Sequence, residues 1–163
     1  MANLSFQTIK DANALTPIMI SQEKSFTLPA SKSPSAVSHF LHQLNNIPLQ
    51  GNKNALGNLA KTLHKQVKKK SLIILVGDFL GDLDVSLLAQ RHELYLIIIR
   101  DSFEENPTAL GDGAYTDPES GESANFYFGK TAKKAYAKAY HDNDEKLFKH
   151  LRALGVPYAK VVK

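Results

Sequence analysis

The chain has 163 residues, of which 43% are hydrophobic and 22% are charged, as is typical of a globular domain. It contains no cysteine, which excludes a disulfide framework and a zinc site made of thiolates. No apolar run approaches the length of a membrane span, and the net charge is a modest +4. We therefore expect one cytoplasmic domain over residues 1–163, with no membrane segment.

The N-terminal part is the least regular. Residues 15–21 and 24–29 alternate like two short strands, whereas residues 3–10 fit either a strand or a helix. Ser33 followed by Pro34 then predicts the start of a helix. A serine side chain can cap free backbone amides, and proline suits the first helical position.

The central part carries the strongest pattern. Residues 72–76 are five consecutive apolar residues, which indicates a strand covered on both faces. Residues 94–99 form a second strand of the same kind. A helix that begins near Asn54 precedes the first strand, and a short helix capped by Asp84 lies between the two.

A loop-rich segment with many turn signals follows the second strand. Within it, Tyr115 and residues 126–128 fit a small β-hairpin that turns at residues 117–121. The order of the elements predicts a three-layer α/β fold, in which helices flank a mainly parallel sheet and the hairpin is an insertion.

The C-terminal part is predicted to hold two helices and a strand. The first helix covers residues 130–140. Asp142, with Glu145 three residues later, matches a capping box and predicts that a separate helix begins there. Gly155 ends that helix, and residues 156–162 supply the last strand.

Both central strands end next to an acidic residue. Asp78 follows the first strand closely, and Asp101 follows the second after an arginine. In an open α/β sheet the binding crevice lies at the carboxyl ends of the strands. The sequence therefore locates the functional edge of the domain at these two aspartates.

The residues from 71 to 101, the acidic-proline segment 102–107 and the stretch Gly-Ala-Tyr-Thr-Asp-Pro-Glu-Ser-Gly-Glu at 113–122 occur in a recognisable order. This order resembles the von Willebrand A-like bacterial proteins of unknown function that accompany MoxR-type AAA+ ATPases. The resemblance covers roughly residues 15–163 and implies a Rossmann-like sheet flanked by helices. Many relatives bind a divalent cation at a metal-ion-dependent adhesion site above the sheet.

This chain departs from the adhesion site that the resemblance implies. The only aspartate before Asp78 is Asp11, so the Asp-x-Ser-x-Ser loop is absent. The threonine position falls on Lys53, and a serine position falls on Gly77. Since only Asp78 remains as a ligand, we expect a degenerate site that holds no metal, with Mg²⁺ binding as the less favoured case.

The strand that carries the missing loop is the central strand in the family. Residues 3–10 can replace it, the sheet can close without it, or the chain is a piece of a longer protein. A sheet without its central strand has an unpaired edge, which favours a homodimer or strand exchange.

Lys53 suggests a further hypothesis about the degenerate site. Its ammonium group can lie where the metal ion lies in relatives, and neutralise Asp78 or Asp101. The alternative is an exposed lysine in a polar loop.

Taken together, the sequence predicts a protein–protein interaction or adaptor module without catalytic activity. The resemblance implies a MoxR-type AAA+ ATPase as the partner. We expect the contact surface to be the rim of the crevice, made of Gly51, Asn52, Lys53, Asn54, Gly77, Asp78, Asp82, Asp101 and Glu104.

Two other functions remain as alternatives. The first is a Mg²⁺-dependent phosphoesterase or nuclease that uses Asp78 and Asp101, because such enzymes cluster carboxylates. The second is nucleic-acid binding through a basic patch. Without interleaved aromatic residues, this patch also fits the solvated end of a helix. The basic patch consists of Lys65, Lys68, Lys69 and Lys70.

Overall fold

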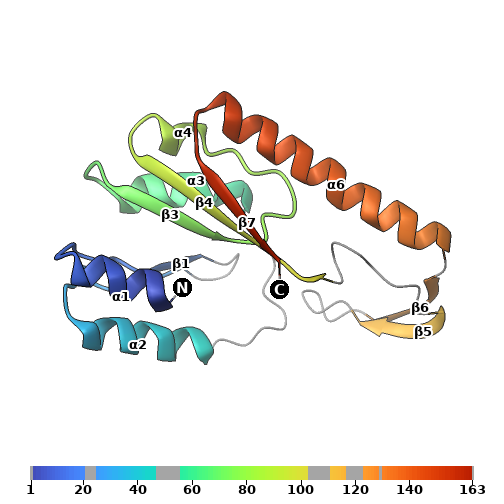
Figure 1. Ribbon diagram of the computed structural model, residues 1–163, viewed down its shortest axis with the longest axis horizontal. Coiled ribbons are helices and arrows are strands. Elements are labelled where there is room, and N and C mark those ends of the chain that lie inside the picture. Colours follow the sequence, from blue (N-terminus) through green and yellow to red (C-terminus); the bar gives the residue numbers. More distant parts are fainter. Residues whose placement is uncertain are drawn as a thin grey trace. The chain divides into compact units, whose positions relative to one another are not determined.

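A computed structural model describes residues 2–20, 25–46, 56–102, 111–116, 123–128 and 130–162 of the chain (Figure 1). Their contacts divide the chain into two compact units. The first comprises Met1–Ala55 and Thr116–Glu122, and the second comprises Leu56–Tyr115 and Ser123–Lys163. The expectation of a single domain over residues 1–163 stays a prediction.

The first unit combines two helices with a short antiparallel strand pair. The strands pair in register from Ile18 with Thr27 to Ile20 with Ser25, as the alternation predicted. The two helices pack against each other. Residues 3–10 are helical, so the alternative in which they replace a missing strand is wrong. The elements are α1 (Ala2–Lys10), β1 (Ile18–Ile20), β2 (Ser25–Thr27) and α2 (Pro34–Asn45).

The start of α2 follows the predicted signal. Pro34 is its first residue, and the Ser33 side chain accepts a hydrogen bond from the Ser35 backbone N–H at 3.3 Å. Val37 and Phe40, three residues apart, are both buried. The serine cap and the apolar spacing together account for this helix.

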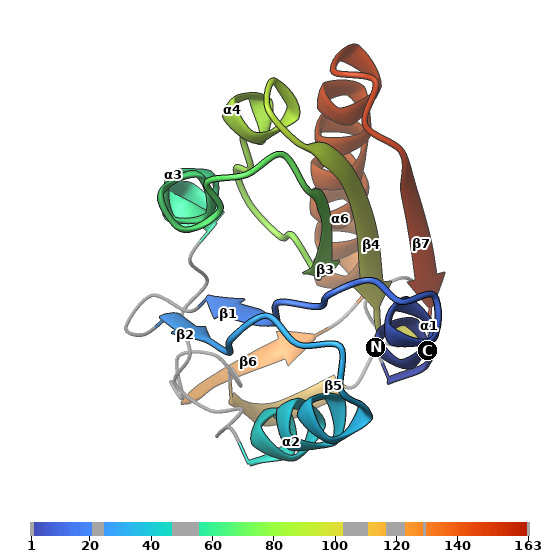
Figure 2. The ribbon, with the colours of Figure 1, turned by 90° about the vertical axis from the view of Figure 1, so that its left-hand side faces the viewer.

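The second unit is built on three parallel strands. Their order in the sheet is β3-β4-β7, so they lie side by side in chain order, although two strands of another sheet come between β4 and β7 in the sequence (Figure 2). This arrangement confirms an α/β fold with a parallel sheet flanked by helices. The elements are α3 (Leu56–Gln66), β3 (Leu72–Gly77), α4 (Ser86–Ala89), β4 (Glu93–Arg100), β5 (Gly111–Thr116), β6 (Ser123–Phe128), α6 (Lys130–Ala153) and β7 (Tyr158–Val162).

The two faces of this sheet differ in burial. Along β4 every second residue is fully buried, and the residues between them are only half-buried. Residues paired across a parallel sheet share a face, and Tyr158 of β7, which pairs with Leu96, stacks on Phe148 of α6. The buried face is therefore the one that α6 covers. The expectation that β3 is covered on both faces was wrong at its first residue, because Leu72 is 62% exposed.

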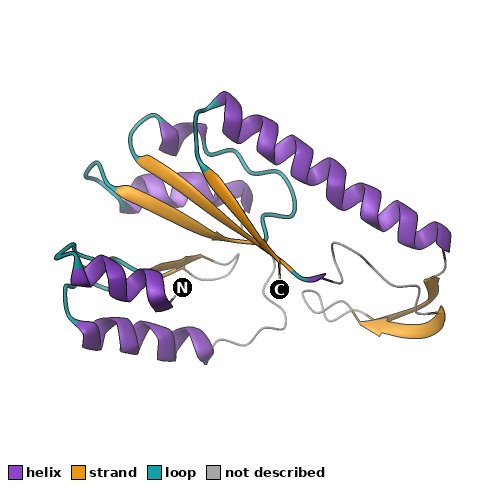
Figure 3. Ribbon diagram, in the orientation of Figure 1, coloured by secondary structure: helices purple, strands orange, loops and turns teal. Residues whose placement is uncertain are grey.

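α6 is one continuous helix of 24 residues (Figure 3). The predicted break at Asp142 was wrong for two reasons. The segment contains no glycine or proline to interrupt the backbone, and the neighbouring Asp144 side chain forms ion pairs instead of capping a helix.

The C-terminus of α6 is where the sequence placed it. Gly155 has a φ of +65°, which glycine adopts without steric strain. The Val156 N–H donates to the Leu151 carbonyl at 2.9 Å, and the Gly155 N–H donates to the Arg152 carbonyl at 3.1 Å. These two bonds form a Schellman motif, which satisfies the last carbonyls of the helix before the chain enters β7.

β5 and β6 form a two-stranded sheet, in agreement with the predicted hairpin. The expected turn at residues 117–121 lies outside the described residues. Among the helices that the structure describes, none is long and apolar enough to cross a membrane.

Candidate interaction site at the carboxyl ends of the strands

The carboxyl ends of β3 and β4 lie side by side in the second unit. Gly77, the last residue of β3, pairs with Ile98 of β4. Asp78 is the next residue after β3, and Asp101 is the next residue after β4. The parallel register therefore brings both aspartates to the same edge of the sheet, with β4 extending further than β3.

Arg100 occupies the interior of this edge. It is the last residue of β4, and the alternation of the strand points its side chain toward the face that α6 covers. The side chain is 0% exposed. The guanidinium group donates a hydrogen bond to the backbone carbonyl of Asp78 and forms an ion pair with Asp144. It also lies 5.8 Å from the centroid of the Tyr140 ring, within the range of a cation–π contact.

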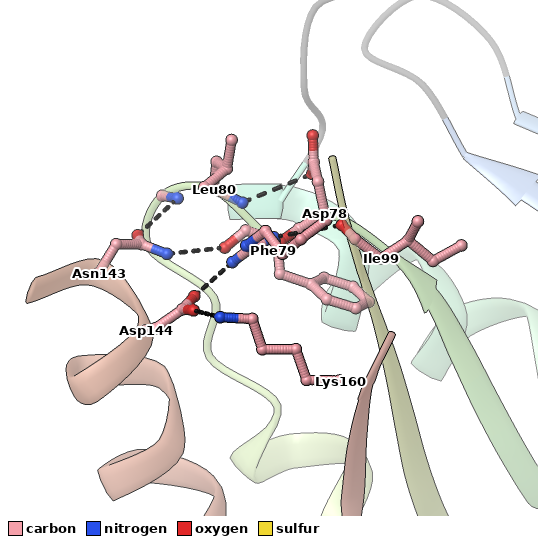
Figure 4. A network of polar contacts seen from close by, with 9 residues as sticks. Asp78, Phe79, Leu80, Ile99, Asn143, Asp144 and Lys160 are labelled. Carbon is pink, nitrogen blue, oxygen red and sulfur yellow. Dashed lines mark hydrogen bonds and ion pairs between the residues drawn. The ribbon is translucent and has the colours of Figure 1, made fainter. Parts of the chain in front are cut away.

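Asp144 joins the helix to two strands. One carboxylate oxygen pairs with Arg100 of β4, and the other accepts a hydrogen bond from Lys160 Nζ of β7 at 2.8 Å (Figure 4). Burial alone would raise the pKa of this carboxyl. The hydrogen bonds and charges of Lys160 and Arg100 outweigh the burial and hold the pKa of Asp144 below its ordinary value. Asp144 is therefore a buried carboxylate shared by two cations.

The loop after β3 is held in a specific shape. Phe79 has a φ of 51°, an uncommon value for a bulky residue, and the residue is only 2% exposed. Asn143 of α6 holds the loop by two hydrogen bonds, since its side chain accepts from the Gly81 N–H at 2.9 Å and donates to the Phe79 carbonyl at 3.3 Å (Figure 4). The Leu80 N–H lies 3.5 Å from an Asp78 carboxylate oxygen. Packing and hydrogen bonds thus fix the loop to the domain.

Exposed carboxylates lie along and beyond this loop. The Asp82 side chain is 85% exposed and pairs with Lys146 of α6, which lowers the pKa of Asp82. Asp84 is 78% exposed and accepts from the Ser86 N–H at 2.9 Å; hydrogen bonding by the Ser86 side chain, and then by the Ser86 backbone, lowers the pKa of Asp84. Asp84 thus binds the first residue of α4, but the N-cap position is held by Val85, so the prediction that Asp84 caps this helix was wrong by one residue. Asp101 is exposed as well. The edge combines an internal ion network with an acidic outer surface.

A family model described as "Protein of unknown function DUF58" matches residues 1–146. The chain belongs to this family. No curated protein matches it.

Two solved structures are similar to this DUF58 protein. The conserved hypothetical protein BatB from Bacteroides thetaiotaomicron has 12% sequence identity and a TM-score of 0.51, over 99% of this chain and 78% of that one. An aerotolerance-related membrane protein from Bacteroides fragilis NCTC 9343, solved with multiple mutations to serines, has 14% identity and a TM-score of 0.47 over 98% and 78% of the two chains. At 12% identity, the BatB similarity concerns the fold alone.

The predicted site residues of this DUF58 member fall into three groups. Gly77, Asp78, Asp82 and Asp101 lie at the carboxyl edge. Five others lie outside the described residues: Gly51, Asn52, Lys53, Asn54 and Glu104. The hypothesis that Lys53 neutralises Asp78 therefore stays a hypothesis. The basic patch of Lys65, Lys68, Lys69 and Lys70 is exposed. Lys65 lies in the last turn of α3, and the other three lie between α3 and β3, near the opposite end of the strand.

Sequence reasoning missed the residues that organise the interior of the site. Arg100 gave one signal in the sequence. It is a cationic residue at the end of an apolar strand, at a position where the alternation of the strand predicts a buried side chain. Asp144 and Asn143 were hidden because their segment was interpreted as a helix start. Lys160 gave no signal, since a lysine in a C-terminal strand is usually exposed.

Among the described residues, no group of three or more histidine, aspartate or glutamate side chains is arranged to hold a metal ion. The carboxylate that lies deepest, Asp144, is already shared by Arg100 and Lys160. The described part of the site is therefore suited to fixing a loop and presenting its acidic side chains.

Proposed function

We propose that this DUF58 protein is a protein–protein interaction module without catalytic activity, whose contact surface is the carboxyl edge of its sheet. We further infer a von Willebrand A-like fold with a degenerate adhesion site. The parallel order β3-β4-β7 supports this inference, since it fits one half of such a sheet. Similarity of fold does not determine function, so the argument rests on the edge itself.

The observation that carries the proposal is the Arg100–Asp144–Lys160 network. Two cationic groups share one carboxylate beneath the loop, and the guanidinium also binds the Asp78 carbonyl. Positive charge at this depth repels a divalent cation and competes for the oxygen atoms that would bind it. The same contacts link β4, α6 and β7 to the loop, which makes the loop a rigid platform for a partner.

The outer surface suggests the chemistry of the partner. Asp82, Asp84 and Asp101 are exposed carboxylates on or near a loop that the domain holds in place. A partner surface with lysine or arginine side chains would be electrostatically complementary to them. A preorganised loop also loses little conformational entropy on binding.

A MoxR-type AAA+ ATPase is the partner we propose. DUF58 proteins are commonly linked with MoxR ATPases. In such a pair the DUF58 chain would act as an adaptor between the ATPase and the protein that it remodels. The acidic edge is the part of the described chain that best fits a docking role.

The test uses the purified chain and the purified MoxR-type ATPase of the same organism. We expect a measurable affinity and a rise in the dissociation constant of at least about tenfold when Asp82 and Asp101 are both changed to Lys. The matched control is Glu93→Lys, because Glu93 is an exposed acidic residue at the opposite end of β4. Equal affinity for the Asp82/Asp101 variant and the unmodified chain would place the contact surface elsewhere.

A further inference from the structure

β3 lies at one edge of the three-stranded sheet. It pairs with β4 on one side, and among the strands that the structure describes none pairs with its other side. The Glu93 N–H donates to the Ser71 carbonyl at 3.0 Å, so residue 71 directs its backbone groups toward β4. Because these groups alternate along a parallel strand, residues 73, 75 and 77 also face β4. The backbone groups of Leu72, Ile74 and Val76 therefore point outward.

This edge lacks the features that normally protect an edge strand. β3 reads Leu-Ile-Ile-Leu-Val-Gly and has no charged residue and no proline. Leu72, at its start, is 62% exposed. Natural edge strands usually carry a lysine, a proline or a bulge that discourages pairing with another chain. An unprotected apolar edge is a site for adding a strand.

The charges at the two ends of β3 select one arrangement. Lys70 lies just before the strand, and Asp78 lies just after it. When the β3 strand of a second copy is placed antiparallel to the first, only one register pairs all three outward-facing residues of one copy with those of the other. In that register Ile74 opposes Ile74 of the second copy, and Leu72 opposes Val76. The same register places Lys70 opposite Asp78, at both ends of the pairing.

We propose that two copies of this chain associate through β3, antiparallel and with a two-fold axis at Ile74, to form a continuous six-stranded sheet. Lys70 of each copy then faces Asp78 of the other copy, so opposite charges meet at both ends of the paired strands. A parallel arrangement would place like charges beside each other, which destabilises strand pairing. The arrangement is isologous, the commonest type in homodimers.

The test exchanges the charges and measures mass in solution by analytical ultracentrifugation. In a homodimer of the Lys70→Asp variant, the new aspartate faces Asp78 of the other copy. In a homodimer of the Asp78→Lys variant, the new lysine faces Lys70 of the other copy. We expect each variant to raise the dissociation constant of the homodimer at least about tenfold. An equimolar mixture of the two variants restores both opposite-charge pairs, so it should form a heterodimer. This rescue is specific to the proposed register.

Two further variants complete the experiment. Lys68→Asp makes the same charge change in the basic patch but lies outside the pairing, and it should leave the dimer intact. Ile74→Pro removes an outward N–H without removing a bond to β4, and it should yield a monomer whose circular dichroism shows a folded chain. If that variant does not fold, the mixing experiment still decides.

Three results would overturn the proposal. The unmodified chain could stay monomeric at high concentration, the single charge variants could dimerise as well as the unmodified chain, or the mixture could fail to form a heterodimer. A monomer that instead binds an extended apolar peptide at β3 would show that the edge accepts a strand from another protein, and would reject the homodimer. Because the readout is self-association, failure here leaves the proposed partner binding at the acidic edge intact.

Discussion

Arg100 at the end of β4 and Asp144 in the middle of α6 form an ion pair whose guanidinium group is completely buried. The two residues are 44 positions apart in the chain. Their contact links the sheet to the helix that covers it. The Arg100 bond to the Asp78 carbonyl extends this link to the loop of the candidate site.

Removing Asp144 should destabilise the fold strongly. Asp144→Ala leaves a buried guanidinium without its carboxylate, which costs about 3 kcal/mol of unfolding free energy. Arg100→Met should cost less, because Lys160 at 2.8 Å still neutralises Asp144. The double variant Arg100→Met/Asp144→Ala should lose less unfolding free energy than the two single variants lose together. Urea unfolding measures each value, with Glu145→Ala, an exposed neighbour on α6, as the near-neutral control.

The same pair makes stability depend on acidity. The pKa of Asp144 lies below its ordinary value of 3.8 in the folded chain, so the unfolded chain takes up its proton first as the pH falls. The contribution of Asp144 to the unfolding free energy is complete above the ordinary pKa of 3.8, and it is lost as the pH falls through the lower pKa of the folded chain. Unfolding free energies from about pH 6 to about pH 3 should therefore drop less steeply for Asp144→Asn than for the unmodified chain. Parallel curves would contradict the assignment.

His92 should cause a second loss of unfolding free energy, at a higher pH than the loss caused by Asp144. It precedes β4, is buried, and neither ring nitrogen has a hydrogen-bond partner among the described residues. Burial, and then the charges of Arg91 and His64, lower the pKa of His92 from its ordinary value of 6.5. The neutral ring is favoured in the fold, so its contribution is complete above 6.5 and falls as the pH decreases below it. His92→Leu should flatten the stability profile between about pH 7 and about pH 5. An unchanged slope would show that His92 does not titrate with unfolding.

Two glycines in the second unit should respond in opposite ways to alanine. Gly81, in the loop held by Asn143, has a φ of +124°, which an alanine adopts only with strain. Gly81→Ala should lower the unfolding free energy by about 1 kcal/mol or more. Gly57 is the second residue of α3 and has nothing within 4 Å of an added Cβ, so Gly57→Ala should raise the unfolding free energy by about 0.5 kcal/mol, less than in a helix interior. Thermal unfolding of the pair tests whether the loop conformation is fixed as described.

Much of the fold could be predicted from local patterns. The apolar run of β3, the serine and proline that start α2 and the glycine that ends α6 each encode their element within a few residues. The break predicted inside α6 failed because the choice between a capping box and a continuous helix depends on Asp144. Its partners, Arg100 and Lys160, lie on two different strands.

The candidate site could be predicted only in part for the same reason. Asp78 and Asp101 were visible because each follows a strand closely, and the parallel register then brings them to one edge. The network beneath them is formed by residues on β4, α6 and β7, and no spacing in the sequence reveals which side chains meet. The sequence thus located the edge, while the structure identified the cations that occupy its interior.

Hydrogen exchange of the chain with and without the MoxR-type ATPase proposed as its partner tests most directly where that partner binds. We expect slower exchange on binding at residues 77–84 and 100–102, the loop and strand end that form the acidic edge. The helix α3, on which Lys65 lies, should exchange at the same rate in both states. Slower exchange confined to α3 and the basic patch, or no change anywhere in the presence of saturating ATPase, would contradict the proposed interaction site.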